Sequence, residues 1–194
     1  MATAIIDGLR ERISSAISVS QSVGIILPGN NHSDLIQALF EYMYSKPEAA
    51  WVYVTIAKPY GSIVKQFGDM LADEGNIRFI DCVSRALGRY EIDSNCIFVE
   101  SPVQLEKMLL EIMNIFKDLK GDVQKYLVID SLSSLLLYND VSLVAEFFTH
   151  LTNRAKLEDI HSISLSIEEE MEDNVNKILY LRSDKILKVR ESFI

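Results

Sequence analysis

The sequence has little of the material from which metal sites, disulfide frameworks and membrane spans are built. It contains 2 cysteines and 3 histidines among 194 residues, and no CxxC or comparable ligand spacing joins them. Cys82 and Cys96 are therefore expected to be free thiols in a reducing cytosol. No apolar stretch reaches the ~18 residues that a membrane span needs. The N-terminal segment carries Asp7 and Glu11 inside its apolar pattern, unlike a signal peptide, so we expect a cytoplasmic protein.

Basic residues are also scarce relative to acidic ones. Lys and Arg together number 19 and Asp and Glu 28, which gives a formal net charge of -9. A surface this acidic repels the phosphate backbones of nucleic acids and anionic lipid head groups. We therefore expect neither nucleic acid nor a membrane as a direct partner.

Strand and helix patterns alternate along the chain. Short apolar, β-branched runs predict strands over 23–27, 51–57, 77–81, 96–99, 125–129 and 161–167. Helical periodicity predicts helices over 2–18, 33–46, 60–75, 102–119 and 141–156. This alternation predicts an α/β fold in which helices cover both faces of a mostly parallel sheet. We expect residues 1–194 to form a single domain.

The end of the chain departs from this alternation. Residues 177–182 and 185–190 each have the composition of a short strand, and Arg182-Ser183-Asp184 between them has the composition of a turn. This pattern predicts a C-terminal antiparallel hairpin at one edge of the sheet.

The run YLVIDSLSSLL, residues 126–136, is an apolar strand that ends in Asp130 and a serine. It resembles the Walker B strand of the RecA/KaiC-like P-loop ATPases. Three other segments resemble parts of that family in the same order: WVYVTIAKPYGSIVKQFGDM, IRFIDC, and HSISLSIEEE with ILYLRSDKILKV. The resemblance spans roughly residues 20–190 and implies a RecA-like fold, assembly through faces near the active-site edge, and an archaeal source.

The phosphate-binding loop expected of that family is not intact in this sequence. A working loop reads GxxxxGK[ST], in which glycine amides converge on the phosphates and the lysine reaches the β and γ phosphates. When the motif is aligned with the stretch GIILPGNNHSDLI, its two glycine positions are occupied by Ile26 and Asn31, and its lysine position is occupied by His32. Ser33 alone is kept, at the position that binds Mg²⁺, and Asp34 adds a negative charge where an anion would sit.

A second part of the expected machinery is also replaced. The resemblance to the KaiC-like branch implies acidic residues after the second core strand, where they activate the attacking water. Ala57, Lys58 and Pro59 occupy those positions, and a lysine cannot act as a base there without a large decrease of its pKa. We therefore expect a catalytically inactive homologue without a cofactor. It would serve as a protein-interaction or regulatory module, with a protein partner or as a homo-oligomer.

The alternative is a nucleotide-binding protein or ATPase with a non-standard loop and MgATP as its ligand. Asp130 and Ser33 would then hold the magnesium ion, and the phosphates would contact Gly29, Asn30, Asn31, His32, Ser33 and Lys58. Each residue type also has an ordinary structural use. Asp130 can cap the turn after its strand, Ser33 or Asp34 can cap the following helix, and His32 and Lys58 can be solvent-exposed loop residues.

Asp81, Cys82 and the residues that follow Asp130 allow further interpretations. A receiver-like domain with a phosphorylatable Asp81 or Asp130 is a weaker possibility. Cys82 follows a strand end but has no histidine partner in a local motif, so we expect a small buried or half-buried side chain there. An apolar run follows Asp130 and serves either the core or, as the resemblance implies, a subunit contact: Leu132, Leu135, Leu136, Leu137 and Tyr138.

Overall fold

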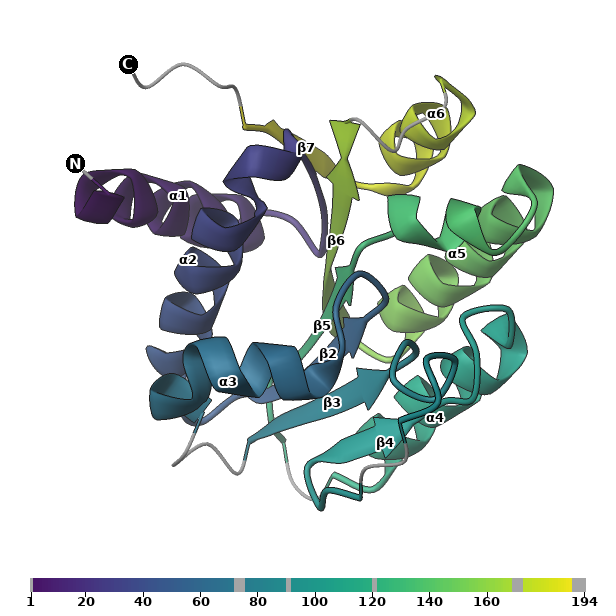
Figure 1. Ribbon diagram of the computed structural model, residues 1–194. Coiled ribbons are helices and arrows are strands. Elements are labelled where there is room, and N and C mark those ends of the chain that lie inside the picture. Colours follow the sequence, from purple (N-terminus) through teal and green to yellow (C-terminus); the bar gives the residue numbers. More distant parts are fainter. Residues whose placement is uncertain (1, 72–75, 90–91, 120–121, 169–172, 190–194) are drawn as a thin grey trace.

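Seven parallel strands form one sheet in the computed structural model (Figure 1), which describes residues 2–71, 76–89, 92–119, 122–168 and 173–189. The strand order is β4-β3-β2-β5-β6-β1-β7. The strands are β1 (Ser22–Leu27), β2 (Ala50–Thr55), β3 (Ile77–Asp81), β4 (Cys96–Phe98), β5 (Lys125–Asp130), β6 (Ile160–Ile167) and β7 (Lys185–Lys188). Every pair of neighbouring strands is parallel.

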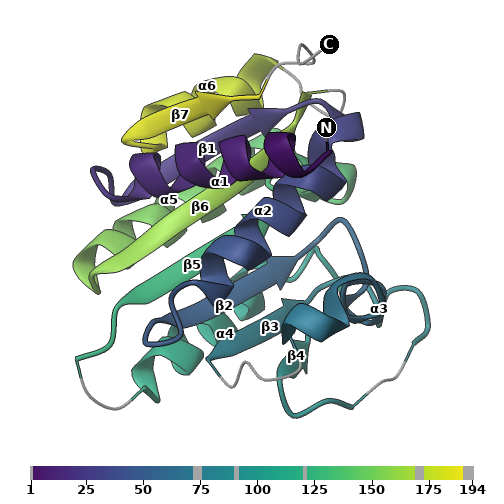
Figure 2. The same ribbon diagram turned by 90° about the vertical axis from the view of Figure 1, so that its left-hand side faces the viewer.

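The helices of the described residues cover both faces of the sheet (Figures 1 and 2). One layer contains α1 (Ala2–Ile17), α2 (His32–Tyr44) and α3 (Tyr60–Leu71). The other contains α4 (Leu105–Lys117), α5 (Val141–Leu157) and α6 (Asp173–Arg182). Two short 3-10 helices, η1 (Gly29–Asn31) and η2 (Ser133–Leu137), follow β1 and β5.

Alternation along the strands divides the buried side chains between two apolar layers. On β5, Tyr126 and Val128 pack on the α1–α3 side, whereas Leu127 and Ile129 pack on the α4–α6 side. Both faces of the central strands are therefore buried, which explains why they read as continuous apolar runs in the sequence. Each large side chain buried in this way stabilises the fold by about 1.5–3 kcal/mol.

The α/β fold with a parallel sheet, predicted from the sequence, is confirmed. All the strands and helices expected before residue 168 are present, with ends that differ by a few residues. The helix expected over 102–119 begins at Leu105, after a turn closed by the bond from the Gln104 amide to the Ser101 carbonyl. The helix expected over 60–75 is described up to Leu71, and its predicted end lies outside the described residues.

The predicted C-terminal antiparallel hairpin is wrong. Residues 177–182 belong to α6, and β7 pairs in parallel with β1. The close approach of α6 to β1 depends on Gly24, because a Cβ there would lie 2.8 Å from Leu179 Cγ and 2.7 Å from Ile186 Cδ1. Tertiary packing of Leu179 in this space thus overrides the β propensity of the local ILYL sequence.

No helix among the described residues is both long and apolar enough to cross a membrane.

Candidate functional site

The residues singled out after the strands gather at the carboxyl edge of the sheet. In a doubly wound sheet this edge is where ligands bind, because the loops after parallel strands converge there. β5 lies between β2 and β6, and β6 lies between β5 and β1. The start of α2, which follows β1, can therefore reach across β6 to the end of β5.

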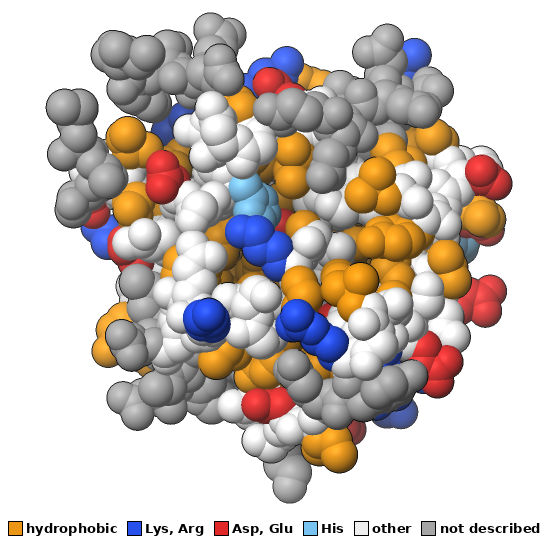
Figure 3. All heavy atoms as spheres, viewed as in Figure 1, with side chains coloured by type: hydrophobic (Ala, Val, Ile, Leu, Met, Phe, Trp, Pro, Cys, Tyr) orange, Lys and Arg blue, Asp and Glu red, His pale blue; other side chains and the backbone are white. Residues whose placement is uncertain are grey.

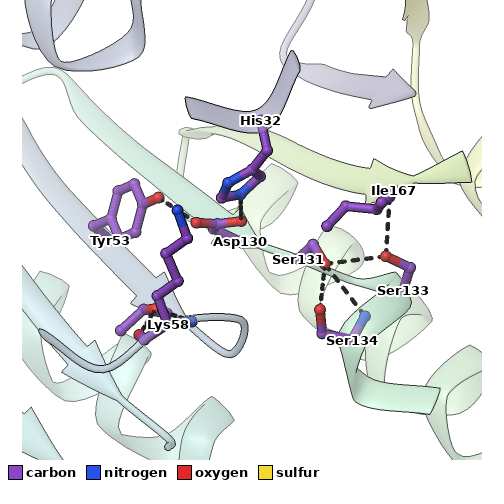
Figure 4. A network of polar contacts seen from close by, with 9 residues as sticks. His32, Tyr53, Lys58, Asp130, Ser131, Ser133, Ser134 and Ile167 are labelled. Atoms are coloured by element: carbon purple, nitrogen blue, oxygen red, sulfur yellow. Dashed lines mark hydrogen bonds and ion pairs between the residues drawn. The ribbon is translucent and has the colours of Figure 1, made fainter. Parts of the chain in front are cut away.

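Asp130, the last residue of β5, is the centre of a buried polar network (Figure 4). Its Oδ1 lies 2.7 Å from Nε2 of His32, and its Oδ2 accepts a hydrogen bond of 2.6 Å from the hydroxyl of Tyr53. Asp130 is 1% exposed and His32 is 6% exposed. The carboxylate is thus held on both oxygens by side chains from two other elements, α2 and β2.

Strand alternation explains how these side chains meet. Tyr126, Val128 and Asp130 alternate along β5 and share the face covered by α2, and Tyr53 lies opposite Val128 on the neighbouring strand. Burial raises the pKa of Tyr53 well above its ordinary value, and the charge of Asp130 and the hydrogen bond to it raise it further. Tyr53 therefore remains a neutral hydrogen-bond donor.

The expectation of a solvent-exposed His32 is wrong. α2 begins at His32 itself, one residue earlier than predicted, and this places the imidazole over the end of β5. A buried imidazole needs polar partners, and Asp130 supplies one. The imidazole and the carboxylate form an ion pair when His32 is protonated and a hydrogen bond when it is neutral.

The expectation that Ser33 or Asp34 caps α2 is also wrong. The N-cap residue is Asn31, and no side-chain hydrogen bond caps the helix. Ser33 is exposed, and its hydroxyl accepts a hydrogen bond of 2.7 Å from the Gln66 side chain on α3. Asp34 lies in the first turn of α2, where its charge is favourable to the helix dipole.

The loop between β1 and α2 is short and tightly wound. Pro28 is extended, and residues Gly29–Asn31 form a single 3-10 turn in which the Asn31 amide donates to the Pro28 carbonyl over 3.0 Å. The His32 amide then donates to the carbonyl of Gly29. The backbone therefore passes from strand to helix within one turn, with some of its amides directed back to its own carbonyls.

Lys58 lies in the loop between β2 and α3 and is half-buried. Thr55 anchors its backbone, because the Thr55 hydroxyl donates to the Lys58 carbonyl and the Lys58 amide lies 3.4 Å from the same hydroxyl. Its side chain is directed towards Tyr53 and Asp130 (Figure 4). Among the described residues, no carboxylate forms an ion pair with its ammonium group.

Asp81, at the end of β3, has a different environment. Its Oδ1 accepts hydrogen bonds from the amides of Val83 and Ser84, and its Oδ2 accepts from the Tyr60 amide and the Ser84 hydroxyl, all over 2.6–2.8 Å. The next residue, Cys82, is fully buried, as predicted. Burial and the neighbouring Asp81 raise the pKa of its thiol far above the range of a reactive cysteine.

Three serines after Asp130 form a second buried cluster (Figure 4). The hydroxyl of Ser131 lies 3.0 Å from that of Ser133 and 2.7 Å from that of Ser134. The Ser133 hydroxyl also accepts a hydrogen bond of 3.0 Å from the amide of Ile167 at the end of β6. These serines fix the loop after β5 to the neighbouring strand.

The apolar run after Asp130 divides between the core and the surface. Leu132 and Leu135 are fully buried, and Leu136 packs partly against them. Leu137 and Tyr138 are 68% and 43% exposed. The core interpretation therefore holds for the first three residues, and the last two remain available for contact with a partner.

Two residues of the Asp130 network could not have been assigned from the sequence. Tyr53 reads as a core residue of a strand, and His32 reads as a loop residue. The sequence did indicate Asp130, because it ends a predicted strand. This located the site but did not identify the residues that contact Asp130. Within the described parts of the chain, no group of three or more His, Cys, Asp and Glu side chains has the arrangement of a metal site.

Comparisons with known proteins support the fold. No protein-family model matches the chain, and no curated protein sequence matches it significantly. A KaiC-like protein from the hyperthermophilic archaeon Pyrococcus horikoshii superposes with a TM-score of 0.60 at 13% identity, over 90% of this chain and 74% of that one. An uncharacterized protein from the same organism, solved in complex with an unknown peptide, gives 0.66 at 14% identity, over 90% and 80%. The chain is thus similar in fold to KaiC-like proteins.

Proposed function

We propose that the chain is a catalytically inactive homologue of the RecA/KaiC-like ATPases that acts as a protein-interaction or regulatory module. One observation carries this proposal: both oxygens of Asp130 already have donors from the protein, His32 and Tyr53. A magnesium ion or its water would have to displace them from a carboxylate that is 1% exposed. Leaving a buried carboxylate without one of its hydrogen-bond donors is costly, about 1–3 kcal/mol or more.

The conformation of the loop before α2 also supports an inactive site. A working phosphate loop surrounds the phosphates with several convergent backbone amides and a lysine. Here the single 3-10 turn of Gly29–Asn31 directs the amides of Asn31 and His32 to carbonyls of its own loop. His32, at the lysine position, is engaged with Asp130. Two of the loop amides and the side chain at the lysine position thus have protein partners.

The interaction role draws on two other observations. The structural neighbour from Pyrococcus horikoshii that was solved with an unknown peptide shows that a protein of this fold can hold a polypeptide. The present chain leaves apolar side chains such as Leu137 and Tyr138 exposed beside the site. We infer that the fold serves as a scaffold for binding a protein partner or a further copy of the chain.

Nucleotide binding provides the test. The unfolding temperature of the purified chain is measured with increasing MgATP, and phosphate release is measured in parallel. A ligand at a hundred times its Kd stabilises the fold by about 2.7 kcal/mol. We expect no stabilisation beyond that given by MgCl₂ alone, and no phosphate release. A saturable shift that is lost in Asp130→Asn would contradict the proposal.

The second candidate is a nucleotide-binding protein with a non-standard loop. The Lys58 side chain favours it, because it reaches the site from the neighbouring strand end and its ammonium has no ion-pair partner among the described residues. If Lys58 replaces the missing lysine of the loop, Lys58→Ala abolishes a MgATP-dependent shift. Lys65→Ala, which removes an exposed lysine of α3, would leave that shift unchanged and is the matched control.

A further inference from the structure

Three loops at the carboxyl edge of the sheet lie next to one another. They follow β3, β2 and β5, which are neighbours in the sheet. Asp81 joins the first two loops, because it accepts hydrogen bonds from Ser84 in one and from the Tyr60 amide at the end of the other. The amides of Ile56 and Ala57 donate to the Asp130 carbonyl and so join the second loop to the third. The three loops therefore form one continuous surface.

Part of this surface is apolar. Leu137 and Tyr138 follow β5 and are 68% and 43% exposed, and Val103, in the adjoining loop after β4, is 54% exposed. We call these three residues the apolar patch. Asn139 holds them together, because its amide donates to the Pro102 carbonyl over 3.2 Å and to the Leu135 carbonyl over 3.0 Å. The patch is thus fixed in place by hydrogen bonds between two loops, and its apolar side chains still face the solvent.

The neighbouring part of the surface is cationic. Lys58, Arg85 and Arg89, which we call the cation cluster, come from the loops after β2 and β3. Within the described residues none of them forms an ion pair. The Nε of Arg85 is also buried and has no hydrogen-bond partner in the part of the chain that the structure describes. A buried donor without an acceptor is unfavourable, so a rearrangement that gives the guanidinium an acceptor would be favourable.

Some basic residues elsewhere in the chain are paired with carboxylates. Arg10 pairs with Asp7 and Glu41, and Lys156 pairs with Asp184. The chain as a whole carries a net charge of -9, so a group of cations on one face contrasts with the overall charge of the chain. Figure 3 shows Lys and Arg side chains gathered near a histidine at the centre of one face, beside a group of hydrophobic side chains, with most acidic side chains towards the rim.

An apolar groove between α4 and α5 is another exposed apolar feature. It is lined by Leu109, Leu110 and Met113, with Arg154 at its side. Arg154 lies 3.0 Å from Glu158 and is therefore already paired. The groove thus gives no charge signal for what would cover it, whereas the carboxyl-edge loops do.

We propose that the apolar patch and the cation cluster together bind an acidic segment of a partner protein, in which carboxylates flank apolar side chains. This inference rests on the proposed interaction role and specifies its partner. The carboxylates would pair with Lys58, Arg85 and Arg89, and the apolar side chains would cover Leu137 and Tyr138. Charge complementarity of this kind selects partners and speeds their association. A nucleic acid could use the cations but has no comparable use for the exposed apolar side chains of the patch.

The test is a selection from a random library of displayed peptides, roughly 12 residues long, against the immobilised full chain. Enriched peptides are synthesised with fluorescein and titrated by fluorescence anisotropy. Leu137→Asp and Arg89→Glu alter the two halves of the surface. Leu157→Asp and Lys117→Glu make the same changes at exposed residues at the C-terminal ends of α5 and α4 and serve as controls. Unfolding temperatures establish that each variant is folded.

We expect enriched peptides to contain Asp or Glu next to apolar residues. Leu137→Asp and Arg89→Glu should each weaken their binding by about tenfold or more, the size of effect seen at central interface residues, and the controls by less than about twofold. Raising salt from about 50 to 500 mM should weaken binding too. Failure to enrich any peptide, enrichment of basic or wholly apolar peptides, or equal binding by all variants overturns the inference.

Three outcomes distinguish failure of this inference from failure of the proposed function. Peptides that bind equally to all four variants would preserve an interaction module and place its surface elsewhere. A fluorescein-labelled random oligonucleotide that binds wild type more tightly than the peptides, and is weakened by Arg89→Glu, would make nucleic acid the ligand and contradict the inference. Turnover of MgATP would contradict the proposed catalytic inactivity and would leave the inference about peptide binding unaffected.

Discussion

Asp81 and Asp130 occupy equivalent places and serve different purposes. Each ends a strand next to β2, each is almost wholly buried, and each carboxylate has partners on both oxygens. Asp81 binds the backbone and hydroxyl groups of its own loop and the start of α3. Asp130 binds two side chains, His32 and Tyr53, from elements distant in the sequence.

The two sites differ in whether the groups around the carboxylate can both donate and accept a hydrogen bond. A backbone amide can only donate, so three of the four groups around Asp81 require an acceptor. The imidazole of His32 and the hydroxyl of Tyr53 can each donate or accept. The site around Asp81 therefore requires acceptors on both oxygens, whereas the Asp130 network can adapt to a changed group. Adaptable groups are also the ones that could respond to a ligand.

The largest effect is expected for Asp81→Asn. In either orientation, the new NH₂ group would point its donors at a backbone amide that now donates to Asp81. At least one buried backbone amide would then lose its acceptor, at a cost of about 1–3 kcal/mol for each group left unsatisfied. We expect a loss of about 3 kcal/mol or more in the free energy of unfolding, measured by urea denaturation. A loss below about 1 kcal/mol would show that the loop rearranges and would break the comparison.

His32→Ala should have the next largest effect. It leaves the buried Asp130 with one partner and opens a space at the start of α2, so we expect a loss of about 2–3 kcal/mol. In an Asp130→Asn background the same change should cost clearly less, since no buried charge is then left behind. Equal costs in both backgrounds, compared as a double-mutant cycle from urea denaturation curves, would show that the two residues are not coupled.

Tyr53→Phe should cost about 1–2 kcal/mol, because Oδ2 of Asp130 loses its donor while the aromatic packing is kept. The pH dependence has a definite sign. Burial and Asp130 raise the pKa of Tyr53, so its contribution is fully present below the unfolded pKa of about 10. It is lost as the pH rises further, because the unfolded chain then releases the proton. The variant should therefore lose less stability above pH ~10 than wild type, as measured by urea denaturation across that range.

The sequence predicted what depends on neighbours in the chain. The parallel sheet, its two helical layers and the burial of Cys82 followed from periodicity and strand composition. The Asp130 position followed from a strand that ends in an acid. Asp81 could also be placed at a strand end, and its bonds to Val83 and Ser84 are the ordinary contacts of a turn-forming aspartate.

Contacts between distant elements were not predictable in this way. Whether His32 is exposed depends on the length of the turn before α2 and on the width of the sheet between β1 and β5. The strand expected over 177–182 failed for a similar reason, since the space above Gly24 that holds Leu179 is created by packing. Local propensity yields to such packing when the two conflict.

Asp130→Asn should be milder than Asp81→Asn, and this contrast is the sharpest test of the comparison. His32 can present its acceptor nitrogen to the new amide, and Tyr53 can still donate to the amide oxygen, so no partner need remain unsatisfied. We expect a loss of about 1 kcal/mol and a ¹⁵N NMR signal of His32 that reports the tautomer with Nε2 as acceptor. A loss as large as that of Asp81→Asn would show that the charge itself is required.

The smallest effect is expected for Ser33→Ala, which tests whether Ser33 belongs with Asp130 at all. Its hydroxyl is exposed and bonds to Gln66 rather than to the buried network, and such surface changes usually stay within about 0.5 kcal/mol. Unfolding temperatures measured with and without MgCl₂ should be the same for wild type and variant. If Mg²⁺ stabilises wild type and Ser33→Ala removes that gain, Ser33 and Asp130 bind the same ion. Asp130 would then be a metal ligand that pairs with His32 only when no ion is bound.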